Sequence, residues 1–238
     1  MSFPLSQAPY DTPLVVEQIR DEQLSRRFTR LGIAQGDVLT RMNEEAHISP
    51  VRVRTPKGEV VLASGMAAKV IIHHDDGHKT PAVEMHPGEE GHVEGLVCGS
   101  ALERGLGILG IHENDRIGML RRIPPMDYVA LKDGSTRTTL TEGMAAKVWG
   151  HVRGRETQFA MAGVGEAFTV TALLGGTRAK ASLENLGVAP GVVLTLESVR
   201  PALGAGRAAK GQTVLRMASG LRLYLRFDLE TCILVRNV

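Results

Sequence analysis

Leu31-Gly32-Ile33 returns as Leu109-Gly110-Ile111 and again as Leu186-Gly187-Val188 in this chain of 238 residues. The three glycines, at 32, 110 and 187, are 78 and 77 residues apart. A period this long makes each copy a small domain rather than one rung of a solenoid. Domains of this size have thin cores, so we expect neighbouring copies to pack together. The chain is therefore divided into three predicted units, residues 1–80, 81–158 and 159–238.

Each unit begins with a predicted strand followed by a short helix. The helix carries apolar residues at positions i, i+4 and i+7, which form one buried stripe. It ends at the repeated glycine, because the residue after a helix often takes left-handed backbone angles. Four residues later stand Gly36, Asn114 and Gly191, where a turn with positive φ is expected. The predicted first strands are residues 14–19, 91–97 and 168–174, and the strands after the helix are 37–41, 115–120 and 192–198.

A hairpin, one helical turn and a last strand complete each predicted unit. The turn is easiest to recognise in the hexamer Gly-Met-Ala-Ala-Lys-Val, which stands identically at residues 65–70 and 143–148. Five short strands cannot bury both faces of an open sheet, so we expect a small, partly open barrel with the helix at one end. The fold class is therefore mainly β. The predicted hairpins are residues 50–63, 127–140 and 212–225, and polar linkers are expected at 75–85 and 153–160.

Composition excludes several classes of protein. The net charge of +2 and the aromatic content of 4% argue against a nucleic-acid binder, which would need a basic face or stacking side chains. Cys98 and Cys232 fall in different units at non-equivalent positions, so no disulfide framework is indicated. The polar start of the chain does not resemble a signal peptide, and no apolar run could span a bilayer. We expect a cytoplasmic protein that does not itself span a membrane.

No catalytic motif stands out. Residues 105–110 match G-x-G-x-x-G, but they lie within and at the end of the repeated helix instead of between a strand and a helix. Two sets of residues are candidate binding sites. His73, His74, Asp75 and His78 could bind a divalent transition metal (Fe2+, Mn2+ or Zn2+), although they fall in an expected linker, where a solvated polar segment is the simpler interpretation. Arg200 lies just before an insertion at 202–211 that contains Arg207 and Lys210, and these three could form a basic finger that contacts an acidic partner, or belong to a flexible hairpin loop.

The third unit shows a further pattern. It reads Gly165-Glu166 before the first strand, Gly175-Gly176 at the turn, Leu-Gly-Val-Ala-Pro-Gly at 186–191, and a closing apolar segment at 225–235. These motifs resemble the FeoA domain, and three tandem copies cover residues 14–235. The third copy matches the pattern best, while the first lacks the Gly-Glu start and has Asp21 in place of the turn glycine.

The resemblance implies SH3-like β-barrels and a role in bacterial ferrous-iron uptake. Single FeoA domains are small cytosolic partners of the FeoB permease, whose G domain binds GTP, and the family implies no catalytic residues. The expected function is therefore a non-enzymatic protein-interaction or regulatory module, with FeoB or its cytosolic G domain as partner. The alternative is a metal-binding sensor similar to the SH3-like domain of iron-dependent repressors. No helix-turn-helix accompanies it, so such a sensor would act through another protein.

Overall fold

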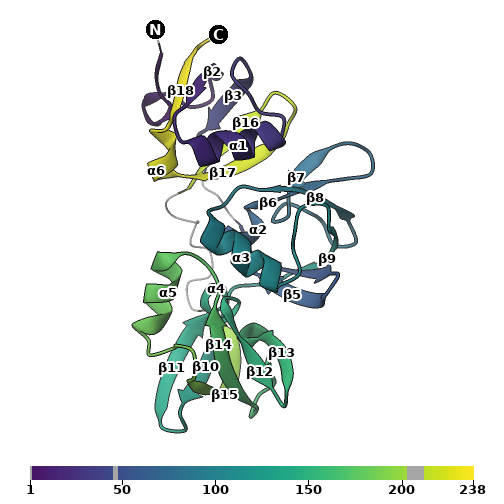
Figure 1. Ribbon diagram of the computed structural model, residues 1–238, viewed down its shortest axis with the longest axis vertical. Coiled ribbons are helices and arrows are strands. Elements are labelled where there is room, and N and C mark those ends of the chain that lie inside the picture. The colour runs from purple at the N-terminus through teal and green to yellow at the C-terminus, as the bar shows by residue number, and fades with distance from the viewer. Residues whose placement is uncertain (1, 45–47, 203–211) are drawn as a thin grey trace.

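The computed structural model describes residues 2–44, 48–202 and 212–238 and shows three lobes arranged along one long axis (Figure 1). Both chain ends lie in the same lobe, which we call the terminal lobe (residues 3–42 and 212–237). The middle lobe comprises residues 51–122 and the distal lobe residues 126–201. Each lobe holds one six-stranded antiparallel sheet and a short helix. The mainly β fold class predicted from the sequence is confirmed, although the sheets are not closed barrels.

Within the described residues, each lobe contains six strands and two α-helices, and the terminal and distal lobes also contain a short 3-10 helix (η). The terminal lobe contains β1 (Phe3–Pro4), η1 (Leu5–Gln7), β2 (Pro13–Ile19), α1 (Glu22–Arg30), β3 (Val38–Met42), β16 (Gln212–Met217), β17 (Arg222–Arg226), α6 (Phe227–Glu230) and β18 (Ile233–Asn237). The middle lobe contains β4 (Val51–Thr55), β5 (Gly58–Leu62), α2 (Ser64–Ala67), β6 (Val70–His73), β7 (Lys79–Pro81), β8 (Glu90–Leu96), α3 (Ser100–Ile108) and β9 (Arg116–Arg122). The distal lobe contains β10 (Met126–Lys132), β11 (Thr136–Thr141), α4 (Glu142–Ala145), β12 (Val148–Val152), β13 (Arg155–Gln158), η2 (Phe159–Met161), β14 (Ala167–Leu173), α5 (Thr177–Glu184) and β15 (Val193–Pro201).

One strand order is repeated three times. It runs β1-β18-β2-β3-β16-β17 in the terminal lobe, β7-β6-β8-β9-β4-β5 in the middle lobe and β13-β12-β14-β15-β10-β11 in the distal lobe. The first strand of each order was not predicted. β7 and β13 lie in the segments expected to be solvated linkers, and the residues beside them, such as Val83 and Phe159, are fully buried. The linker prediction was wrong because strands of two to four residues are too short to show an alternating pattern.

The lobes cut across the repeats found in the sequence. Within every unit, the first two strands pair in one lobe and the hairpin pairs in the next. Thus β10 follows β9 along the chain, but β9 pairs with β4 and β10 pairs with β15. Only Ile123-Pro124-Pro125 joins β9 to β10. A proline fixes its own φ and disfavours helical angles in the residue before it, so this link favours continued extension over a tight reversal.

The short helices follow the sequence closely. In α1, Leu24 and Phe28 are buried, and Asp21 accepts a hydrogen bond from Leu24 N at 2.7 Å as the N-cap. This capping role explains why an aspartate replaces the turn glycine in the first unit. Past the helix ends, φ is +78° at Gly32, +75° at Gly110 and +73° at Gly187, as predicted. The expected stripe on α5 is incomplete, because Leu183 is buried but Leu186 is 36% exposed.

Neighbouring lobes share buried contacts. Between the middle and distal lobes, the buried Gln158 amide donates to Val61 O at 2.8 Å and accepts from Val61 N at 2.8 Å. Between the terminal and middle lobes, Lys69 donates to Tyr224 O, and burial lowers the pKa of Lys69 to about 8. The middle core also includes Tyr224 from the terminal lobe. Across the parts of the chain that the structure describes, every helix is too short or too polar to cross a bilayer.

Candidate interaction surface

The histidines singled out by the sequence lie on and after β6, and each engages a different partner. His73 Nδ1 lies 3.3 Å from Glu94 Oε2. His74 Nε2 lies 2.9 Å from Thr80 Oγ1, and the His74 ring stacks on His78 with the centroids 4.0 Å apart. Asp75 accepts two hydrogen bonds from Arg116, at 2.9 and 3.1 Å, and these bonds lower the pKa of Asp75. The four side chains therefore do not converge on one point.

No group of three or more His, Cys, Asp or Glu side chains that could hold a metal ion occurs in residues 2–44, 48–202 and 212–238. The cause is local geometry. Successive side chains on a strand point to opposite faces, so neighbours such as His73 and His74 diverge. The turn residue His78 pairs with Asp76 instead of joining His73. Closeness in the sequence was the only signal for this set. In the folded hairpin only His74 and His78 lie against each other, while His73 and Asp75 turn to Glu94 and Arg116.

The predicted basic set is only partly described. Arg200 lies exposed near the end of β15, opposite Asp127 on β10. Arg207 and Lys210 lie outside the described residues. The structure therefore describes only Arg200 of this predicted set.

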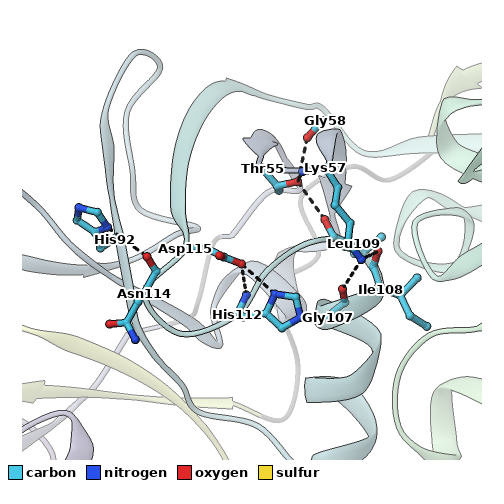
Figure 2. Close-up of polar contacts among 10 residues, drawn as sticks. All are labelled: Thr55, Lys57, Gly58, His92, Gly107, Ile108, Leu109, His112, Asn114 and Asp115. Carbon is cyan, nitrogen blue, oxygen red and sulfur yellow. Dashed lines mark hydrogen bonds and ion pairs between the residues drawn. The ribbon is translucent and has the colours of Figure 1, made fainter.

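A different surface recurs in the lobes, where the end of the helix meets the turn of the hairpin. In the middle lobe, Lys57 from the β4–β5 turn lies over the end of α3 (Figure 2). Its ammonium donates to Gly107 O at 3.2 Å and reaches Ile108 O at 3.5 Å. The Thr55 hydroxyl is 3.1 Å from Leu109 O. These donors satisfy carbonyl groups that a helix leaves unpaired at its C-terminus, and the cation complements the helix dipole.

The loop after α3 completes this surface. Asp115 Oδ2 accepts from His112 N at 2.8 Å and lies 2.9 Å from His112 Nδ1 (Figure 2). Asn114 has φ +70°, as its position in the repeat predicted, and its carbonyl oxygen lies 3.3 Å from His92 Nδ1. The result is a rim of exposed and half-exposed polar side chains around the end of α3.

Sequence reasoning missed Thr55 and Lys57 as parts of a surface. Lys57 stood out only as the middle residue of Pro56-Lys57-Gly58, a turn signal between two strands. The available signal was a lysine in the hairpin of two of the three units. Its meaning depends on the approach of the hairpin to a helix in another sequence unit, which the sequence pattern does not show.

The model of the FeoA domain matches residues 3–74 and 80–151, more than half of the chain. Comparison with curated proteins and with solved structures gave no match. The third unit, which we ranked closest to the family pattern, lies outside the matched residues, so that ranking was wrong. This unit carries the insertion at 202–211 and reads Phe-Asp-Leu-Glu at α6, where the other units read Ser-Gly-Met-Ala at α2 and Glu-Gly-Met-Ala at α4.

The two matches begin 77 residues apart, which agrees with the spacing of 77–78 residues between the repeated glycines, and they fit the strand order shared by the lobes. The chain belongs to the FeoA domain family, whose members are small non-catalytic domains associated with ferrous-iron transport.

Proposed function

We propose that this protein is a non-enzymatic interaction module of bacterial ferrous-iron transport, and that it binds the cytosolic G domain of a FeoB permease. The observation that carries the proposal is the double FeoA match over residues 3–74 and 80–151. The protein acts by docking, and its lobes offer repeated but chemically different helix-end surfaces.

The arrangement of the lobes supports a docking role. Three related surfaces lie on one elongated body, so several weak contacts can act together when a partner spans them (Figure 1). The surfaces differ in charge and in whether a side chain covers the helix end. Lys57 covers the end of α3 in the middle lobe, while the terminal lobe has Ser219 in its hairpin turn. Such differences allow one partner to be recognised in a single orientation.

The direct test is binding of the full chain to the purified cytosolic domain of FeoB from the same organism. We expect saturable binding by biolayer interferometry with GDP or a non-hydrolysable GTP analogue present. Deletion of the gene should also slow growth when Fe2+ is the sole iron source, and not when a chelated ferric source is supplied.

The test variant is the double substitution Lys57→Ala, Arg30→Ala, which removes exposed helix-end groups in two lobes and is compared with the wild-type chain. Weaker binding by this variant supports docking through these surfaces. Absence of binding by the wild-type chain in every nucleotide state, together with normal growth on Fe2+, contradicts the proposal.

A further inference from the structure

The three lobes differ in what surrounds the glycine that follows the helix. In the middle lobe, a Cβ placed on Gly110 would lie 2.8 Å from Cγ of Lys57. In the distal lobe, a Cβ on Gly187 would collide with Nζ of Lys132. In the terminal lobe, a Cβ on Gly32 would meet nothing within 4 Å. Two lobes thus lay a lysine of their own hairpin across the helix end, and the terminal lobe does not.

The hairpin residues explain this difference. Thr55, Lys132 and Met217 each end the first strand of their hairpin, and Lys57 stands two residues after Thr55 as Ser219 stands two after Met217. The terminal lobe therefore has methionine and serine where the middle lobe has threonine and lysine. Among the described residues, no donor reaches the carbonyl oxygens of Arg30 and Leu31, the counterparts of Ile108 and Leu109.

The space left open is a pocket of about 330 Å3 between the terminal and middle lobes. Its apolar wall includes Leu31, Ile33 and Leu221, and the β6–β7 turn of the middle lobe closes one side with Gly77 and His78. This wall suits a chain of methylene groups, since apolar surface is favourably removed from water.

The polar end of the pocket suits a cation. Asp37 lines it, and one carboxylate oxygen of Asp37 is occupied by Ala34 N at 2.7 Å. The C-terminus of α1 adds the negative end of the helix dipole. Lys79 also lines the pocket, but its ammonium donates to Glu94 at 2.6 Å, and nearby Arg30 donates to Glu113 at 2.8 Å. Both cations are therefore paired with carboxylates.

We propose that this pocket accepts a lysine side chain of a protein partner, in the place that Lys57 and Lys132 fill in the other two lobes. The lysine methylenes pack on the apolar wall, and the ammonium binds the helix-end carbonyl groups and Asp37. The inference rests on the proposed docking function, because a partner must supply the lysine.

The test uses N-acetyl-L-lysine N-methylamide as probe. Its control is the norleucine compound, whose side chain has the same four carbons but lacks the ammonium. Amide signals of the full chain are followed by 1H–15N NMR during titration. We expect saturable shifts at Gly32, Ile33, Gly77 and Gly220 with the lysine probe and none with the norleucine probe. Because no partner is present, failure here is distinct from failure of FeoB binding.

Matched variants locate the site. Ser219→Lys reproduces the lysine of the middle lobe and should weaken probe binding at least tenfold. Ser135→Lys makes the same change in the exposed distal hairpin turn, where Lys132 already covers the helix end, and should bind as wild type. Asp37→Asn keeps an acceptor for Ala34 N and should weaken binding several-fold, which provides a second variant if Ser219→Lys does not fold.

Three results would overturn the proposal. They are equal shifts with the norleucine probe, undiminished binding by both folded Ser219→Lys and Asp37→Asn, and the absence of any saturable shift at the pocket.

Discussion

The distal and terminal lobes share one strand order, but the distal lobe is a single run of residues and the terminal lobe is assembled from both ends of the chain. In the distal lobe β10 and β15 pair within residues 126–201, whereas in the terminal lobe β3 pairs with β16 from the far end. The comparison shows that the sheet requires a set of strands and not a particular connection between them. Chain connectivity decides instead which segments of the sequence a fragment must contain for a lobe to fold.

The terminal lobe has a buried ion pair that joins its two chain segments. Arg41 donates to Glu230 at 2.9 Å, and the two side chains are only 9% and 2% exposed. Arg41 also donates to Ala8 O at 3.1 Å, and Glu230 accepts from Thr213. The corresponding positions are apolar in the other lobes, Met119 with Ala67 in the middle lobe and Leu196 with Ala145 in the distal lobe. The ionic contact thus occurs only in the lobe whose halves are far apart in the sequence.

The largest expected effect is on folding, when two fragments of the chain are cut at different boundaries. A fragment of residues 124–202 keeps every strand of the distal sheet and should fold alone. A fragment of residues 80–151, which is one of the family matches, separates β9 from β4 and β10 from β15, so it should not fold as a monomer. Circular dichroism melts and light scattering distinguish the two. A cooperative melt from monomeric 80–151 would show that the exchange of hairpins between lobes is dispensable.

The next effect concerns the ion pair of the terminal lobe. Glu230→Ala leaves the Arg41 guanidinium buried without its partner and should lower the free energy of unfolding by about 3–5 kcal/mol. The double variant Arg41→Met, Glu230→Ala copies the middle lobe and should recover most of that loss, as measured by urea unfolding. If the single and double variants are equally unstable, packing rather than an unpaired charge accounts for the loss.

A smaller change in the free energy of unfolding, this time an increase, is expected from a substitution in the distal lobe. Glu142 is 2% exposed, and neither of its carboxylate oxygens has a hydrogen-bond partner among the described residues. Burial raises the pKa of Glu142 to about 7 from 4.5. The folded state then binds more protons than the unfolded state between these values, so stability falls as pH rises through this window.

Glu142→Gln removes this penalty. At about 1.4 kcal/mol per pKa unit, the variant should gain up to about 3 kcal/mol at pH 8 and lose this advantage by about pH 4.5. Urea unfolding at several pH values measures the difference. A gain that is independent of pH would mean that ionisation of Glu142 is not its cause.

The smallest expected effect is on the melting temperature, and it compares the helix ends of the terminal and middle lobes. Ser219→Lys gives the terminal lobe the arrangement that Lys57 makes in the middle lobe. A cation at a helix C-terminus stabilises by about 0.3–1 kcal/mol, and salt screens it. The melting temperature should therefore rise slightly in low salt, with Ser135→Lys as the unchanged control. A decrease in the melting temperature would show that the terminal hairpin cannot present a lysine to α1.

The local elements were largely predictable. The repeated glycines, the apolar residues of α1 and α3, and the turns at Gly36, Asn114 and Gly191 follow from backbone sterics and helical spacing within a few residues. The strands β1, β7 and β13 were missed because they are too short to carry a pattern. The proposed metal ligands were grouped by sequence distance alone, and the β6–β7 hairpin points His73 and His78 toward different acidic residues.

The sequence by itself determined the threefold repeat, the family, and the order of the helices and longer strands along the chain, because local spacing and repeated residues are visible without knowledge of the fold. Only the tertiary structure decided that each hairpin pairs with strands of another unit, that the two chain ends form one lobe, and that the end of α1 borders an open pocket. Strand pairing is set by backbone hydrogen bonds and by burial of one face. Neither of these leaves a mark in the sequence that says which repeat supplies the partner.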